Sequence, residues 1–180
     1  MPSQLTRRLV VAATLVTSLL ASGIVHRGAI EMPAWQQTGS EAWAAFSRHA
    51  DVTFPALIIY PLEAFTGAIL SIATVLSFRR DGSQPRPAAL PVYAAALMTI
   101  GGLLATTQAA PIMLSVRDLN DVDALQRALN GFQFWGNIRG IFQFLAFVAN
   151  LWSTVAILSA GQTAAKATVR KERRSAGIRA

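Results

Sequence analysis

The hydrophobic residues of this chain of 180 residues gather in four long runs that short polar segments separate. The runs cover approximately residues 9–25, 54–78, 90–114 and 131–160. Each run is near or above the ~17–25 residues that a helix needs to cross the hydrocarbon core of a bilayer. The pattern therefore predicts an all-α fold, an integral membrane bundle of four helices.

The polar segments predict where these helices end. Residues 79–87 predict a tight loop, and residues 119–123 are typical of a helix cap that opens a short amphipathic turn before the fourth span. In the longest connection, residues 32–35 predict a turn and residues 40–46 a short helix at the membrane surface. Its aromatic residues, Trp35, Trp43 and Phe46, fit the aromatic belt at the headgroup level. A lid over a pocket between the spans is the alternative interpretation.

Composition supports the membrane class, since 53% of the residues are hydrophobic and only 14% are charged. Soluble domains usually carry about 25% charged residues. The chain has no cysteine. Disulfide scaffolds, thiolate metal sites and thiol catalysis are therefore excluded.

The basic residues predict the orientation. One side of the predicted membrane carries eleven Lys and Arg against two acidic residues, whereas the other carries four against six. The positive-inside rule puts both termini in the cytoplasm, and we expect the inner membrane of a bacterium. We divide the chain into a membrane domain, residues 1–165, and a basic cytoplasmic tail, residues 166–180. The tail favours binding to anionic lipid over nucleic acid.

The first run has a second interpretation as a secretory signal. The basic Arg7 and Arg8, the apolar run and the segment Leu20-Ala21-Ser22-Gly23 resemble a signal peptide with a cleavage site. The run continues through Val25, however, which favours an uncleaved first span. Cleavage would leave the orientation of the other three spans unchanged.

Arg139 lies well inside the fourth run, where an arginine costs ~2.5–3.5 kcal/mol on insertion scales and needs a partner. Helical steps from Arg139 define a stripe of mostly small and polar residues: Phe132, Trp135, Gly136, Gln143, Ala146, Asn150 and Ser153. Glu63 in the second run lies at the same depth, ~12–15 Å below the outer boundary. We therefore expect a Glu63–Arg139 ion pair and a polar pocket in the outer half of the bundle.

Other residues in the outer half of the bundle or at its outer boundary are candidates for binding a substrate: Tyr60, Gln108, Trp135, Gln143, His26 and His49. The two histidines have three open interpretations, as interfacial residues, as an acid/base at the pocket mouth, or as metal or haem ligands. Two histidines without cysteine make a thin ligand set, so we expect no metal and no cofactor. The sequence shows no nucleotide-binding or catalytic-triad motif.

Residues 134–139, Phe-Trp-Gly-Asn-Ile-Arg, resemble the Trp…Asn-x-Arg pattern of a four-helix membrane family that includes fungal anthrone oxygenases and uncharacterised bacterial proteins. The order of elements is also similar, including a Pro-Ile at 111–112, although Met113 stands where that family often has asparagine. The resemblance implies a cofactor-independent oxygenase acting on an aromatic, polyketide-like substrate. It also implies that Asn137 and Arg139 lie at the site.

Two functions remain open. The first is a membrane enzyme, with Arg139, Glu63 and Asn137 as catalytic residues, acting on a lipophilic molecule that enters from the bilayer. It predicts a cavity lined by Glu63, Tyr60, Gln108 and Trp135. The second is a non-catalytic subunit of a larger complex or a homo-oligomer, with a tightly packed interior. The Glu63–Arg139 pair would be functional in the first and structural in the second.

Overall fold

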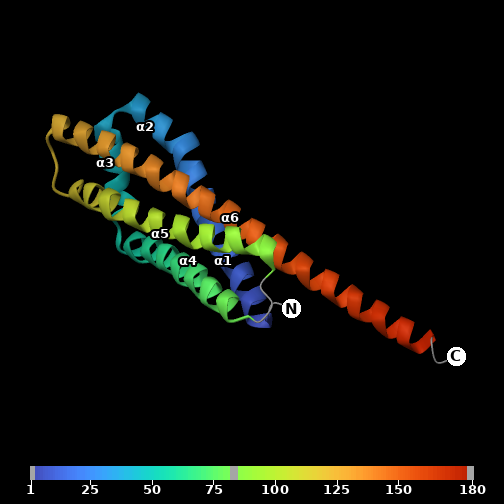
Figure 1. Ribbon diagram of the computed structural model, residues 1–180. Coiled ribbons are helices and arrows are strands. Elements are labelled where there is room, and N and C mark those ends of the chain that lie inside the picture. The colour runs from blue at the N-terminus through green and yellow to red at the C-terminus, as the bar shows by residue number, and fades with distance from the viewer. Residues whose placement is uncertain (1–2, 82–84, 178–180) are drawn as a thin grey trace.

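The computed structural model describes the backbone of residues 3–81 and 85–177, and the side chains of residues 3–81 and 85–162. Over this part of the chain it is all-helical (Figure 1). The elements are α1 (Gln4–His26), a π-helical turn (Arg27–Glu31), α2 (Met32–Thr38), α3 (Ser40–His49), α4 (Phe54–Arg80), α5 (Arg86–Ser115) and α6 (Val122–Gly177). The predicted basic tail lies outside the residues whose side chains are described.

Four helical segments are long and apolar enough to cross a membrane: Gln4–Thr38, Phe54–Arg80, Arg86–Ser115 and Val122–Gln162. They pack as the predicted bundle of four helices, so the fold is that of a multi-pass membrane protein. Around the bundle α1 packs against α4 and α6, and α5 packs against the same two helices. Helices α4 and α6 are therefore diagonal neighbours, with α1 and α5 between them.

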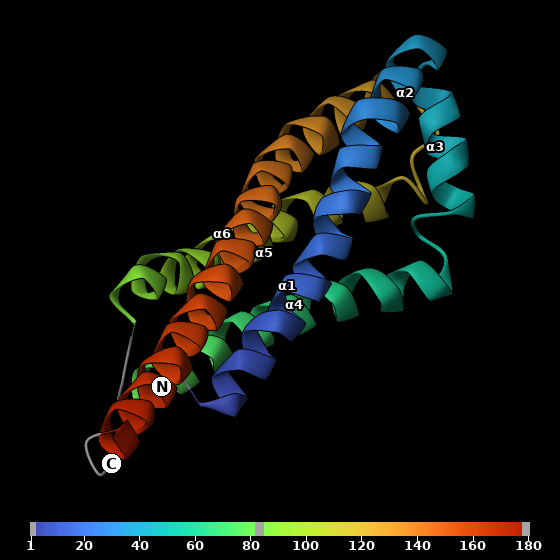
Figure 2. The same cartoon turned by 90° about the vertical axis from the view of Figure 1, so that its right-hand side faces the viewer.

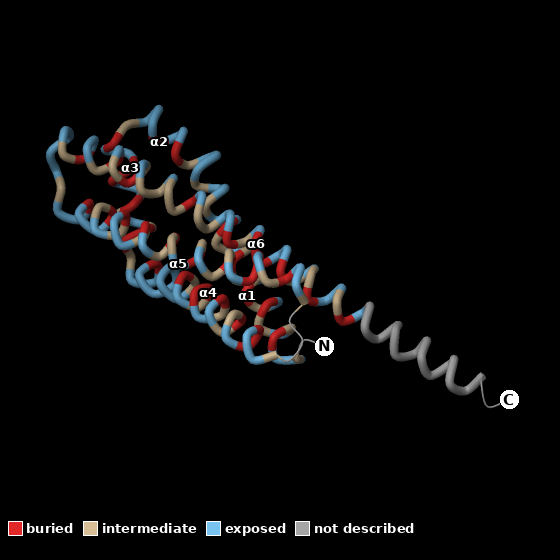
Figure 3. The backbone as a smooth tube through the Cα atoms, viewed as in Figure 1, coloured by how far each residue is buried: buried red, intermediate tan, exposed pale blue. Residues whose placement is uncertain are grey.

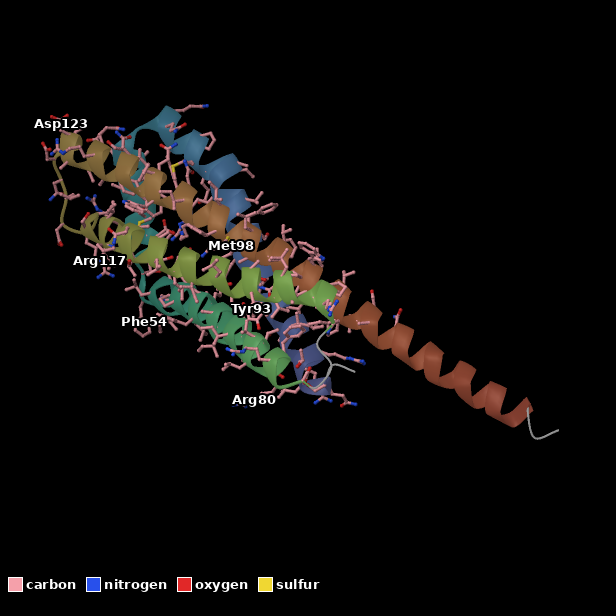
Figure 4. The ribbon with its side chains drawn as sticks, in the orientation of Figure 1. Phe54, Arg80, Tyr93, Met98, Arg117 and Asp123 are labelled. Atoms are coloured by element: carbon pink, nitrogen blue, oxygen red, sulfur yellow. The ribbon has the colours of Figure 1, made fainter. Side chains whose placement is uncertain are left out.

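Figures 1 and 2 show α2, α3 and the α5–α6 connection at one end of the bundle, which we call the loop end. The N-terminus and the α4–α5 connection lie at the opposite end. Phe54 begins α4 near the loop end and Arg80 ends it at the other, whereas Arg117 and Asp123 flank the connection at the loop end (Figure 4). Buried positions follow the inner sides of the helices, and their outer sides are exposed (Figure 3).

The first span does not end near residue 25, and the turn predicted at residues 32–35 is wrong. The helix continues from α1 through the π-turn into α2, which has Pro33 in its first turn. A proline ring crowds the carbonyl group four residues earlier, here that of Ala29. Ala29 lies in the π-turn. The wider backbone of that turn accommodates the proline without breaking the helix.

Two tryptophans of the longest connection are buried in the protein, so their placement in an aromatic belt is wrong. Trp35 is 6% exposed and Trp43 is fully buried, in a cluster with Met113, Leu129 and Phe132 of α5 and α6. Helix α3 exists as predicted, but α2 and α3 fold back over the loop end and pack there.

Arginines fix this cap to the α5–α6 connection. Arg48 of α3 donates through Nε to the carbonyl oxygen of Val116 at 3.0 Å and through Nη2 to that of Leu119. Arg117 donates in return to the carbonyl oxygen of Val52 at 2.6 Å.

The predicted N-terminal capping of the last helix by residues 119–123 is confirmed, because Asp121 Oδ2 accepts a hydrogen bond from the backbone amide of Ala124 at 2.8 Å.

The middle of the bundle is held by small and hydroxylic residues. Asn150 Nδ2 of α6 lies 3.5 Å from both Thr17 Oγ1 of α1 and Ser71 Oγ of α4, and Ser71 lies 3.4 Å from Thr99 Oγ1 of α5. All four spanning helices therefore meet at one polar centre, as small and polar residues allow in membrane bundles.

Candidate active site

A cavity of about 610 Å³ lies between α1, α4, α5 and α6, in the half of the bundle nearer the loop end. Its size falls within the roughly 300–1,000 Å³ of small-molecule sites. Most lining residues are apolar, among them Leu57, Phe65, Leu103 and Phe132. Its charged residues are Arg27, Glu31, Asp51, Glu63 and Arg139, and Tyr60 and Gln143 add polar groups. A large apolar space with a few convergent polar groups is typical of a ligand site.

The shortest ionic contact at the cavity is between Arg27 and Asp51, with Nη2 and Oδ1 2.6 Å apart. Arg27 Nε also donates to Glu31 Oε2 at 3.0 Å, one helical turn away. Asp51 is only 4% exposed, and it also accepts hydrogen bonds of 3.3 Å from Ser47 Oγ and from the Tyr60 hydroxyl. This buried carboxylate is thus satisfied by three partners from three elements.

Aromatic rings surround the Arg27 guanidinium. Its Cζ atom lies 6.0 Å from the ring centroid of Trp35 and 5.9 Å from those of Tyr60 and Phe132. Such rings attract a cation through their negative faces. The charge of Arg27 is therefore compensated both by carboxylates and by aromatic faces, which accounts for its partial burial.

Arg139 has no comparable compensation. Its Nε is buried without a hydrogen-bond partner, and no carboxylate lies within 4.0 Å among the residues whose side chains are described. Its Cζ atom lies 6.0 Å from the ring centroid of Phe132. A buried guanidinium with an unpaired donor is costly, so Arg139 is the group on this wall that most needs a partner.

The predicted ion pair between Glu63 and Arg139 is not formed. Both residues line the cavity, but no contact of 4.0 Å or less joins them. Glu63 lies on α4 and Arg139 on α6, the diagonal neighbours of the bundle, and the cavity lies between them. The sequence predicts a similar depth for the two residues, but it does not predict that α4 and α6 are diagonal neighbours.

The other candidate residues divide into two groups. Tyr60, Gln143 and His26 line the cavity, and His26 Nε2 lies 3.6 Å from Glu31 Oε1. The residues that do not line it are Gln108, Trp135, Asn137 and His49.

The structure places these four residues elsewhere. Gln108 is exposed beside Thr107, and His49 is exposed with Nδ1 2.8 Å from the carbonyl oxygen of Ala45. Trp135 packs on the cluster under the cap, and Asn137 is exposed. Because α6 is a continuous helix, Asn137 and Arg139 point in different directions.

Sequence reasoning missed Arg27, Glu31 and Asp51 because they look like ordinary charges outside the membrane. The i,i+4 spacing of Arg27 and Glu31 was a signal for their pairing. Nothing in the sequence marked Asp51, whose role depends on the path of the α3–α4 connection. In the described part of the chain, no group of three or more His, Asp or Glu residues is arranged to hold a metal ion.

Comparisons with known proteins gave no match, either to a family model, to a curated protein or to a solved structure.

Proposed function

We propose that this protein is a membrane enzyme that binds a lipophilic small molecule in the cavity, where Arg139 holds an oxygen atom of that molecule. The observation that carries the proposal is the buried, unpartnered Nε of Arg139 on the wall of a cavity of about 610 Å³. A guanidinium offers a planar fork of donors that matches a carbonyl, enolate or carboxylate oxygen. A ligand oxygen would supply the partner that the chain itself does not.

Glu63 gives the site its second reactive group. It lines the same cavity as Arg139, and no salt bridge of the described residues includes it. A carboxylate with this freedom suits proton abstraction from a ligand. Arg139 would then stabilise the negative charge that develops on the ligand oxygen. This electrostatic stabilisation is stronger in a cavity that excludes water than it would be in bulk water.

The resemblance to the anthrone oxygenase family suggests how the reaction continues. Glu63 removes a proton from a CH₂ group conjugated with the bound carbonyl, and the resulting carbanion reacts with O₂. The CH₂ group and O₂ together give a carbonyl group and water. O₂ is the oxidant, and the chain supplies the base and the oxyanion partner. This is cofactor-independent oxygenase chemistry on an aromatic or otherwise lipophilic substrate.

The cavity favours an enzyme over the non-catalytic subunit, which predicted a tightly packed interior. For the location, we propose the inner membrane of a bacterium with both termini in the cytoplasm, on the basic residues of that side. The loop end would then face outward, and the basic tail would lie on anionic lipid.

Turnover of the co-purifying molecule tests the proposed reaction. Lipophilic molecules extracted from the purified protein are identified by mass spectrometry and returned to wild type and to Glu63→Gln and Arg139→Gln in nanodiscs. We expect wild type to convert one of them with uptake of O₂, and both variants to lose conversion. Glu41→Gln, on the exposed side of α3, is the matched control. Full conversion by both folded variants would contradict the proposed roles.

A further inference from the structure

The cavity reaches the surface of the bundle along the loop-end half of α4. Several of its lining residues are also exposed, including Leu57 at 38%, Phe65 at 58% and Leu114 at 40%. In a protein that crosses a membrane, apolar side chains exposed at this level face lipid. The cavity is therefore continuous with positions that contact the bilayer.

One edge of α4 at this opening consists of apolar residues that line the cavity. On α4 the cavity-lining residues Leu57, Pro61 and Phe65 recur every four positions and form one edge of the helix. A different side of α4 packs on α1, because a Cβ added at Gly67 would lie 3.5 Å from Leu20 Cδ1. This edge is therefore turned away from α1.

Helix α5 supplies the opposite edge. Leu103, Thr107, Ala110 and Leu114 follow a helical stripe, and all four line the cavity. The only polar group in this stripe, the Thr107 hydroxyl, donates to the carbonyl oxygen of Leu104 at 2.7 Å. We call the space between these two edges the α4–α5 groove. Its walls offer no unsatisfied side-chain polar group to a passing apolar molecule.

The edge between α1 and α4 has a different chemistry. It contributes Leu19 and Gly23, but also the two titratable residues His26 and Glu63. An apolar molecule that passed there would displace water from both polar side chains, which costs free energy unless new hydrogen bonds form. The chemistry of the walls therefore favours the α4–α5 groove.

Resting on the proposed function, we propose that the α4–α5 groove is the passage through which the apolar body of the ligand moves from the bilayer into the cavity. Arg48 and Arg117 hold the cap at the loop end through hydrogen bonds to backbone carbonyl groups, whereas the walls of the α4–α5 groove are apolar. The ligand class that fits this passage is an uncharged lipophile dissolved in the hydrocarbon of the membrane. A headgroup-bearing, water-borne anion does not fit it.

Labelling of a single cysteine tests the passage, since the natural chain has none. Thr106→Cys places a thiol on the cavity wall next to the α5 stripe. The probe is N-(1-pyrenyl)maleimide dissolved in nanodisc lipid, and the rate of labelling is measured. Adding Ala110→Trp fills the groove, and we expect labelling to slow about tenfold, equivalent to ~1.4 kcal/mol of added barrier. Leu104→Trp, at a lipid-facing position of α5 outside the cavity lining, should leave the rate unchanged.

One further variant and a second labelling reagent make the outcome decisive. Gly23→Trp fills the α1–α4 edge, and we expect it to change the rate little. If Gly23→Trp slows labelling and Ala110→Trp does not, the passage lies between α1 and α4 and the proposal is wrong. Labelling of Thr106→Cys by a membrane-impermeant charged thiosulfonate that is faster than labelling by N-(1-pyrenyl)maleimide would also overturn the proposed passage. With either result, loss of the ligand from Arg139→Gln would still support the proposed function. Failure of the proposed passage can therefore be distinguished from failure of the proposed function.

Discussion

At the scale of single residues, the two arginines of the cavity carry the same charge but differ in their partners. The Cζ atoms of Arg27 and Arg139 lie 5.9 and 6.0 Å from the ring centroid of Phe132. Arg27 also has two carboxylates, whereas Arg139 has a buried Nε without a partner. Arg27 thus forms a structural ion pair, whereas Arg139 has a free hydrogen-bond donor that can bind a ligand.

This difference predicts opposite effects on stability. Arg27→Gln leaves Asp51 buried with its charge uncompensated, so we expect a loss of ~3–5 kcal/mol in the free energy of unfolding. Arg139→Gln removes an uncompensated charge, so we expect ligand-free stability to stay the same or rise, as at other functional sites. Reversible unfolding in detergent measures both, with Arg127→Gln on the exposed side of α6 as the control. Equal destabilisation by the two substitutions would contradict the assignment.

Asp81, outside the spans, predicts a pH dependence. Burial alone would raise the pKa of its carboxyl group, but the hydrogen bond from the Ser3 backbone amide, 3.0 Å long, lowers the pKa below its ordinary value. A lowered folded-state pKa gives stability that is present above the ordinary value of about 3.9 and is lost as the pH falls further. We expect wild type, but not Asp81→Asn, to lose this increment in an acid titration of the melting temperature. Parallel titration curves for the two proteins would refute it.

At the scale of elements, the sequence predicts the four spans because long apolar runs depend only on local composition. It does not predict the continuation of the first helix through the π-turn, because a proline normally marks a boundary. Trp35 and Trp43 were misplaced for a related reason. Their apolar bodies suit a lipid interface or a protein core equally well, and only the fold of α2 and α3 decides between them.

Close helix packing makes a prediction at the same scale. A Cβ added at Gly101 of α5 would lie 2.6 Å from the Phe142 ring of α6, whereas one at Gly136 would meet no atom within 4 Å. Gly101→Ala should therefore cost ~1–3 kcal/mol through overpacking. Gly136→Ala should be neutral or stabilising by up to ~1 kcal/mol through helix propensity. Unfolding in detergent compares the two, and a milder effect at Gly101 than at Gly136 would count against the packing described.

At the scale of the whole molecule, the position of α4 diagonal to α6 determines the site. The sequence predicts Glu63 and Arg139 at equal depth, and both line the cavity, but it does not predict that they come from diagonal helices with the cavity between them. The order of helices around a bundle is a long-range property that hydropathy does not encode. The same arrangement brings Asp51, from a connection, to the cavity. The positions of Glu63 and Arg139 within their apolar runs can thus be predicted from the sequence, whereas their placement across the cavity and the presence of Asp51 depend on how the helices are arranged.

Native mass spectrometry of the protein released from lipid nanodiscs tests whether Arg139 holds a ligand in the cavity. We expect wild type to retain one lipophilic small molecule per chain, and Arg139→Gln, folded to the same extent, to lose it. Gln126→Ala, on the exposed side of α6, should retain it like wild type. Retention of the same molecule at the same occupancy in Arg139→Gln would contradict the claim that Arg139 holds the ligand.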